Sequence, residues 1–291
     1  MEQATDTRGL KIALAVSVVL VILQLTAYFL TNIVSQLTAA FDSLSDVIIS
    51  SFLWISVYLS RKPADELHMF GYGRAQNVAA LISASMLIFW LSFGAFQSAI
   101  PKFFEPEPSE FHNVNFALAV SVIAIIAYAI PFVDILGRKS KSPALKAQIV
   151  ALLEMEIAFT AVLIGVILTA QGYSLADPIV SVFVASIIAI SGVYLLKDNV
   201  SYLIGKAPGE EFMKKVEATA MSVMGVLGVH DLKAEFVGPG IVHAGFHIEV
   251  ARGTPVEAAD RIAEEIQAKI GKETGCRYCV IHVDPKPVET I

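Results

Sequence analysis

Cysteine is nearly absent from the chain, and the two cysteines present, Cys276 and Cys279, both stand near the carboxyl end. One closely spaced pair cannot supply the disulfide framework of a small secreted domain, so the sequence suits a reducing compartment. The chain also lacks a block of basic residues, and its formal net charge is −6 at pH 7. These features exclude a nucleic acid as an expected partner.

Charged residues of either sign make up only 16% of the chain, whereas hydrophobic residues make up 55% and the mean hydropathy is +0.66. A water-soluble domain of 291 residues cannot bury so much apolar surface, so a lipid bilayer must be part of the solvent. The apolar residues fall in runs long enough to cross about 30 Å of hydrocarbon as helices. We expect an all-α bundle of six transmembrane helices, over residues 10–32, 33–60, 78–100, 114–137, 148–171 and 178–203.

Lysine and arginine fall in alternate connections between these runs, as in the loop with Arg61, Lys62 and Arg74 and in the one between Arg138 and Lys146. Since basic residues of short loops stay on the cytoplasmic side, the pattern predicts a multi-pass protein of the cell membrane with both termini in the cytoplasm. The first run is too long for a signal-peptide core and has no small-residue cleavage site after it, so we expect it to be retained.

After residues 207–209, Ala-Pro-Gly, the composition becomes that of a water-soluble domain, with charged residues interspersed among apolar ones. We therefore divide the chain into a transmembrane domain, residues 1–207, and a cytoplasmic domain, residues 208–291. In the second domain the spacing predicts helices over residues 210–224 and 255–270, and strands over residues 229–237, 241–250 and 277–284. This pattern indicates an α+β domain with helices on one face of a sheet.

Carboxylates within the predicted membrane helices are functional candidates, since each is costly in lipid unless it is paired, hydrated or bound to a cation. Asp42 and Asp46 lie four residues apart near the middle of the second run and so share one face of a helix. A cation between them would relieve their repulsion; a water-filled vestibule or protonation is the alternative. The fifth run adds Glu154 and Glu156, which point about 200° apart on a helix, so only one can face the aspartates squarely.

Together with these residues, three further segments resemble the cation diffusion facilitator family of divalent-metal transporters. They are the loop from Pro63 to Arg74, with the sequence Pro-Ala-Asp-Glu-Leu-His-Met-Phe-Gly-Tyr-Gly-Arg, and the tail segments Val229-His-Asp-Leu and Ile281-His-Val-Asp-Pro285. The resemblance covers nearly the whole chain. It implies a homodimer that exchanges cytoplasmic metal for protons, and a metal-binding tail with a ferredoxin-like, metallochaperone-like fold.

Zinc-carrying members of this family commonly complete the membrane site with a His-x-x-x-Asp pair in the fifth span. The segment Val162-Leu-Ile-Gly165 fixes the register here, and it places Leu152 at the histidine and Glu156 at the aspartate. The resemblance thus implies a site made of the two aspartates and Glu156, with Glu154 as an auxiliary ligand or proton carrier. Because this set lacks the imidazole that favours zinc, it favours Mn²⁺ or Fe²⁺ over Zn²⁺.

The resemblance implies further metal ligands outside the membrane. In the loop, Asp65 and His68 match part of the family's second site, although such a pair is more often a surface feature. Arg74 resembles a basic residue used in pairing the dimer, but no acid stands at the corresponding place near Gly205. The tail has imidazole and carboxylate groups that suit zinc and other first-row divalent ions and match the family's binuclear site. They are His230, His247, His282, Asp284 and, where a histidine is common, Asp260.

Two functions are compatible with these features. The first is proton-coupled efflux of a divalent metal cation, in which metal ions and protons compete for the same carboxylates. The second is a metal-responsive membrane scaffold or sensor that binds metal in its tail but does not transport. We find no nucleophile–base arrangement and no cofactor loop, so we expect neither an enzyme nor an organic cofactor. Cys276 and Cys279 have the spacing of half a zinc site, and we expect buried or incidental thiols rather than redox or soft-metal groups.

Overall fold

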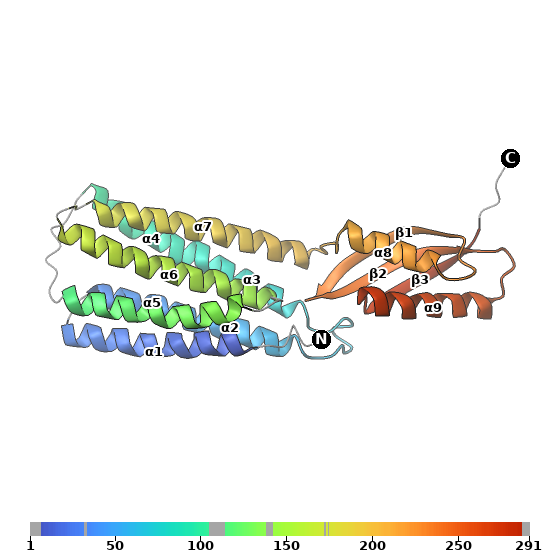
Figure 1. Ribbon diagram of the computed structural model, residues 1–291, viewed down its shortest axis with the longest axis horizontal. Helices are drawn as coiled ribbons and strands as arrows, with labels where there is room; N and C mark the ends of the chain where they lie inside the picture. The colour runs from blue at the N-terminus through green and yellow to red at the C-terminus, as the bar shows by residue number, and fades with distance from the viewer. Residues whose placement is uncertain are drawn as a thin grey trace. The chain divides into compact units, whose positions relative to one another are not determined.

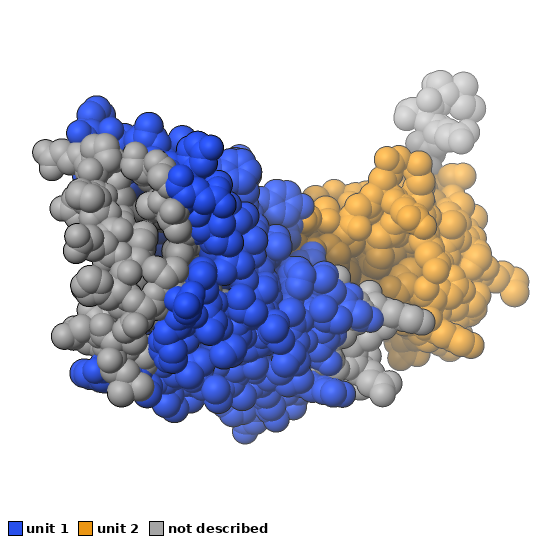
Figure 2. Space-filling model, turned by 60° about the vertical axis from the view of Figure 1, so that its left-hand side comes forward, with its two compact units in different colours: residues 1–62, 75–200 blue, residues 63–74, 201–291 orange. Residues whose placement is uncertain are grey.

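The computed structural model describes residues 7–31, 34–104, 114–137, 142–171, 173 and 175–286. Its contacts divide the chain into two compact units, which Figure 2 shows in different colours. Unit 1 contains residues 1–62 and 75–200, and unit 2 contains residues 63–74 and 201–291. The loop 63–74 therefore groups with the carboxy-terminal domain, although the helices on both sides of the loop belong to unit 1.

Unit 1 is built from helices, most of them long (Figure 1). They are α1 (Arg8–Thr31), α2 (Val34–Leu59), α3 (Ala75–Met86), α4 (Phe93–Ala99), α5 (Val114–Leu136), α6 (Pro143–Ala170) and α7 (Ala176–Leu203). A π-helical segment, Leu87–Ser92, joins α3 to α4, and a 3₁₀ turn, Pro101–Phe103, follows α4. The predicted third span is therefore a run in which the hydrogen-bonding pattern changes near its centre.

Among the residues that the structure describes, four helical runs are long and apolar enough to cross a membrane, namely Arg8–Thr26, Asp42–Leu59, Ala75–Ser92 and Leu118–Leu136. Helices α6 and α7 each contain 28 residues, which corresponds to about 42 Å and exceeds the hydrocarbon thickness. Large apolar side chains are exposed on the outside of the bundle, among them Ile22, Trp90, Ile126 and Ile190. The protein is thus membrane-embedded through several apolar helices, and the count of six spans stays a prediction.

Small and polar side chains bring the helices of unit 1 together. A Cβ atom on Gly192 of α7 would lie only 2.6 Å from Ile88 Cγ1, so glycine permits this close approach. Asn77 Nδ2 of α3 donates a hydrogen bond to Asn199 Oδ1 of α7 at 3.1 Å. Close backbone approach and buried polar pairs are the usual means of joining helices in lipid, where apolar surface alone gives no preference for a protein partner.

The carboxy-terminal part of unit 2 confirms the predicted α+β domain. It contains α8 (Glu210–Met221), β1 (Gly228–Gly238), β2 (Ile241–Val250), α9 (Val256–Thr274) and β3 (Tyr278–Pro285). The sheet order is β1-β2-β3, with β1 antiparallel and β3 parallel to β2. Helix α9 runs four residues past its predicted end, to Thr274, and the next residue, Gly275, has a φ of 71° and provides a left-handed helix cap.

The sheet of this domain has one buried and one open face. Alternate residues of β2, from Val242 to Val250, are buried in a core that includes Val216 of α8 and Ile266 of α9. Since successive side chains of a strand point to opposite faces, the intervening residues of β2, including His247, point away from these helices. The open face is therefore the one that presents the histidines.

The loop 63–74 packs against the tail through an ion pair and a hydrogen bond of Arg74, which together are called the clasp. Arg74 Nη2 lies 2.9 Å from Glu235 Oε2 on β1 and donates a second hydrogen bond to Phe236 O at 3.1 Å. A Cβ atom on Gly205 would lie 2.9 Å from the same Glu235 oxygen. The acid that the sequence lacks near Gly205 is thus supplied in space by Glu235, which lies far along the chain.

Glycine and aromatic contacts reinforce the clasp. A Cβ atom on Gly73 would lie 2.7 Å from Gly238 Cα, so only glycine allows the loop backbone to approach the end of β1 this closely. The Phe70 ring lies 5.0 Å from the His243 ring and 5.1 Å from the Tyr278 ring. The loop is therefore an integral part of unit 2.

Removal of Glu235 should loosen the loop. We expect Glu235→Ala in the full chain to speed amide hydrogen exchange in residues 66–74, while the strands of the tail stay protected. A half-exposed ion pair contributes at most about 1 kcal/mol, so the increase should not exceed about fivefold. Exchange followed by mass spectrometry measures this. Glu210→Ala, which removes the exposed Lys214–Glu210 pair of α8, is the control. Identical loop exchange in both variants would contradict the clasp.

Candidate metal centres

Three carboxylates approach one another inside unit 1. Asp42 and Asp46 lie one turn apart on α2, and Glu154 lies on α6. Asp42 is partly buried, whereas the exposed fraction is 0% for Asp46 and 6% for Glu154. Glu154 is close enough to both aspartates for their charges to interact. Asp46 Oδ1 and Glu154 Oε2 are buried and have no hydrogen-bond partner among the described residues. A cation is the group that would stabilise such an arrangement.

Polar side chains from two other helices, α1 and α5, border these carboxylates. Ser17 Oγ of α1 contacts both Asp46 Oδ2 and Ala13 O, so two acceptors share its single hydroxyl hydrogen. Tyr128 of α5 is completely buried and interacts electrostatically with Asp46 and Glu154. A cavity of about 10 Å³, the space of roughly one water molecule, lies beside Glu154. The group is thus polar on its inner side although the surrounding helices are apolar.

The structure brings Glu154, and not Glu156, to the aspartates. Glu156 is only partly buried, and its Oε1 atom has no hydrogen-bond partner among the described residues. Leu152 is fully buried in the apolar core. The register assigned from Val162–Gly165 therefore differs from the observed rotation of α6. Two residues on a helix correspond to about 200°, so the rotation that presents Glu154 turns Glu156 away.

Asp65 and His68 lie together in the loop, but hydrogen bonds of the loop itself occupy the aspartate. Asp65 Oδ2 accepts from the Tyr72 hydroxyl at 2.7 Å, and Asp65 Oδ1 accepts from the His68 backbone N–H at 2.7 Å. These hydrogen bonds, that of Tyr72 first, hold the pKa of Asp65 below its usual value. Asp65 thus shapes the loop, and metal binding by the Asp65/His68 pair stays a prediction.

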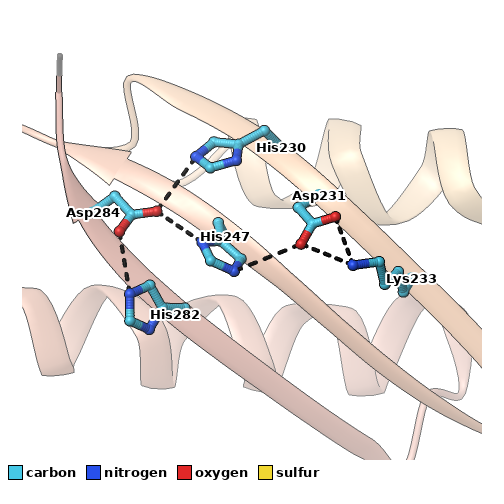
Figure 3. A network of polar contacts seen from close by, with 6 residues as sticks. All are labelled: His230, Asp231, Lys233, His247, His282 and Asp284. Carbon is cyan, nitrogen blue, oxygen red and sulfur yellow. Dashed lines mark hydrogen bonds and ion pairs between the residues drawn. The ribbon is translucent and has the colours of Figure 1, made fainter.

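Three histidines from three strands surround the carboxylate of Asp284 (Figure 3). In the sheet register His230 of β1 pairs with His247 of β2, which pairs with His282 of β3. Asp284 Oδ2 lies 2.8 Å from His247 Nδ1 and 3.4 Å from His230 Nε2, and Asp284 Oδ1 lies 3.2 Å from His282 Nε2. Ligand atoms of His230, His247 and Asp284 lie within 4.8 Å of one another, so these groups could hold a metal ion.

Asp284 is the centre of the cluster. Its hydrogen bond with His247 is the main cause that holds the pKa of Asp284 below its usual value, and the charges of the three histidines add to it. Its two oxygens face different histidines, so one carboxylate serves two neighbouring positions. The side chains are partly exposed, which leaves the cluster open to ions from solution.

Asp231 is a member of the cluster that the sequence analysis missed. The pairing of β1 with β2 shifts register between His230 and Lys233, and Asp231 has a φ of 50° there. Its Oδ2 atom lies 3.9 Å from His247 Nε2 (Figure 3). A hydrogen bond and ion pair with Lys233 lower the pKa of Asp231. Its position directly after His230 in the sequence was the available signal, but the bulge that turns it was not predictable.

Asp260 does not join the cluster within one chain. It is exposed on α9, the helix that contributes Ile266 and Ile270 to the buried face of the sheet. The histidines lie on the opposite face, so the sheet separates Asp260 from them. Its predicted role as a ligand has no support from the described contacts of a single chain.

The two cysteines pack in the core of the tail. Cys276 is buried, Cys279 is partly buried, and both thiols are free. Cys276 Sγ lies 3.5 Å from Val242 O. A hydrogen bond from Cys279 is the main cause that lowers the pKa of Cys276 to about 7, and it raises the pKa of Cys279. This location agrees with the expectation of buried thiols.

Comparisons with known proteins cover both units. A family model described as the cation efflux transmembrane domain matches residues 10–204, and one described as the cytoplasmic domain of cation efflux proteins matches residues 208–286. An uncharacterized transporter of Methanocaldococcus jannaschii is 26% identical over 268 residues, covering 92% of this chain and 94% of the relative. The cation-efflux pump FieF of Cronobacter sakazakii is 27% identical over 279 residues, covering 96% of this chain and 92% of the relative.

Among solved structures, a nickel form of the MamM carboxy-terminal domain is 26% identical. It covers 27% of this chain and 100% of its own, with a TM-score of 0.26. The family matches extend from the first helix of unit 1 to the last strand of the tail. Since the transmembrane match alone spans more than half of the sequence, this chain belongs to the cation diffusion facilitator family of metal-cation efflux proteins.

Proposed function

We propose that this chain forms a homodimer that moves a divalent transition-metal cation out of the cytoplasm in exchange for protons. Mn²⁺ or Fe²⁺ is the favoured cargo, and Zn²⁺ is the alternative. The observation that carries the proposal is the group of Asp42, Asp46 and Glu154, which share electrostatic contact inside membrane helices. Membership of an efflux family supports the direction of transport, and the match to a cytoplasmic-domain model supports cytoplasmic termini.

The donor atoms of the membrane group determine the favoured metal. Aspartate and glutamate offer oxygen only, and the bordering Ser17 and Tyr128 offer hydroxyl oxygen. Oxygen ligands suit Mn²⁺, whereas imidazole and thiolate ligands favour Zn²⁺. No histidine or cysteine side chain is found in contact with these carboxylates in the part of the chain that the structure describes. The oxygen-only argument made from the sequence therefore applies with Glu154 in place of Glu156.

Proton exchange follows from the burial of the same carboxylates. An empty, fully ionised group would place three negative charges close together away from water, which is strongly unfavourable. Either a divalent cation or protons can neutralise them, and both need the same oxygen lone pairs. A conformation that exposes the group to one side of the membrane exchanges one occupant for the other, so the two flows are coupled. Asp46, which is completely buried, is the central ligand.

For the tail, we propose that the cluster around Asp284 binds two divalent ions that share its carboxylate. The His230/His247 side uses one oxygen of Asp284 and His282 uses the other. Imidazole ligands make this cluster better suited to zinc than the membrane group is. Asp231 is the nearest additional carboxylate for the His247 side.

Two alanine variants test whether Glu154, as in the structure, or Glu156, as the sequence register implied, serves the membrane group. We expect Glu154→Ala to lower Mn²⁺ flux into sealed vesicles by about 100-fold, because loss of a group that only supports a metal ligand already costs about 10–100-fold and Glu154 is proposed as a ligand itself. Glu156→Ala should retain flux within about threefold, because its side chain faces away. Flux is measured with the purified full chain and normalised to inserted protein. The reverse pattern would restore Glu156 to the site.

The identity of the cargo can be tested by changing the ligand type. We expect Glu154→His to shift transport selectivity from Mn²⁺ toward Zn²⁺ by about tenfold or more, since an imidazole nitrogen then replaces a carboxylate oxygen. Competition between the two ions in vesicle flux measures the shift. Leu152→His is the matched control, because Leu152 is buried in the apolar core and its side chain points about 200° away from Glu154 around α6. Strong zinc preference in the parent would contradict the oxygen-only argument.

The tail cluster is tested in the full chain carrying Asp46→Ala, so that the membrane group contributes little. We expect His247→Ala together with Asp284→Ala to remove most Zn²⁺ binding that remains, because these residues form the centre of the cluster. Calorimetric stoichiometry is the measurement. His243→Ala, on the same face of β2 but outside the cluster, serves as the control. Unchanged stoichiometry in the double variant would show that the ligands are elsewhere.

A further inference from the structure

Gln148 is a buried amide of α6 that lies next to the membrane carboxylates. Its side chain is 0% exposed, and its Oε1 atom accepts a hydrogen bond from Ser50 Oγ of α2 at 3.0 Å. The amide is also near enough to Asp46 to interact with the carboxylate. Since only the Nε2 end can donate, this end faces Asp46. Gln148 Nε2 and Asp46 Oδ1 are both buried, and neither has a hydrogen-bond partner of ordinary geometry among the described residues.

A glutamine amide can present either a donor or an acceptor at this position. Its two ends have nearly the same size, and half a turn about the last side-chain bond exchanges them. In the turned state Oε1 faces Asp46, and Nε2 donates to Ser50 Oγ. The Ser50 hydroxyl accepts as readily as it donates, so the link between α2 and α6 is kept in both states. Both states are therefore compatible with the same backbone.

We propose that Gln148 is a further ligand of the transported cation. Its carbonyl oxygen binds the ion held at Asp46, and the amide turns to donate to Asp46 when the ion leaves. Ser50 holds the amide in both orientations and is a positioning residue. This inference rests on the proposed transport function and adds a residue that the carboxylate group alone does not include.

A neutral oxygen ligand has a specific physical consequence at this site. Three carboxylates already exceed the charge of a divalent ion, so a fourth carboxylate would add repulsion in the empty state. An amide adds one oxygen without charge, which suits ions that accept several oxygen ligands, such as Mn²⁺. In the empty state its N–H group also stabilises the carboxylate that the ion has left. The residue therefore acts in both halves of the cycle.

The chain contains a matched control for this proposal. Gln76 of α3 is also 0% exposed, and its Nε2 atom donates to Ser60 Oγ at 2.8 Å, while its Oε1 atom has no hydrogen-bond partner among the described residues. It thus resembles Gln148 in burial and in its single serine contact. In the described part of the chain it has no contact with the membrane carboxylates. A purely structural role for a buried amide would make the two residues behave alike.

The experiment measures Mn²⁺ flux in sealed vesicles containing the full chain, as a function of Mn²⁺ concentration. We expect Gln148→Leu to raise the half-saturating concentration by about tenfold or more, because a ligand is lost. Gln76→Leu should change it by less than about twofold with a similar shift in thermal midpoint, since it removes an amide remote from the ion. Ser50→Ala should give an intermediate rise, because it removes the group that holds the amide and not the ligand.

Metal preference provides a second readout that a structural role would not change. We expect Gln148→His to improve Zn²⁺ competition against Mn²⁺ by about tenfold, because an imidazole nitrogen would then reach the ion. This readout also decides the matter if Gln148→Leu fails to fold. Equal half-saturation in the two leucine variants, or unchanged metal preference in Gln148→His, would overturn the role of Gln148. A parent protein without Asp46-dependent Mn²⁺ flux would instead refute the proposed function.

Discussion

The burial of like charges among apolar helices is the constraint on which the organisation of unit 1 depends. Asp46 and Glu154 lie inside a bundle whose outer surface consists of large apolar side chains. Because lipid offers no hydrogen bonds, the groups that stabilise these carboxylates must come from the protein itself or from bound ions, protons or water. Ser17 of α1, Tyr128 of α5 and Gln148 of α6 lie at the positions where this is needed. The polar interior is thus assembled from helices that are almost uniformly apolar elsewhere.

The tail also places polar side chains beside an apolar core, but it does so with a sheet instead of a helix bundle. The alternation of β2 places its apolar residues against α8 and α9 and its His247 on the open face. A shift of one residue in register would move His247 into the core and break the pairing with His230 and His282. The hydrophobic core therefore fixes the position of the three histidines, although it contains none of them.

Local patterns in the sequence predicted the features that depend on neighbouring residues. The alternation of the strands and the amphipathic spacing of the helices predicted the α+β tail, and the four-residue spacing of Asp42 and Asp46 predicted their shared face. The choice between Glu154 and Glu156 depends on how α6 is rotated against α2. That rotation is set by how residues such as Leu152 pack in the core. The sequence of α6 alone does not specify this packing, because it depends on the other helices.

Two other features depend on contacts between distant parts of the chain, and spacing could not predict them. The bulge that turns Asp231 toward His247 arises from the pairing of β1 with β2. The partner of Arg74 is Glu235, which is 161 residues away along the sequence. A comparison of neighbouring positions near Gly205 therefore found no acid, although one lies beside this glycine in space. In both cases the sequence contains the residue types, but it does not show the geometry that brings them together.

The two proposed metal centres differ in their donor atoms, and this difference has a consequence for selectivity. The membrane group offers oxygen, whereas the tail cluster offers three imidazoles around one carboxylate. Under the proposed function the tail binds zinc more tightly relative to manganese than the membrane group does. The tail is also partly exposed, so it equilibrates with ions in solution without the conformational change that the membrane group requires. Under the proposed function, this difference in donor atoms makes the tail the more zinc-selective of the two centres.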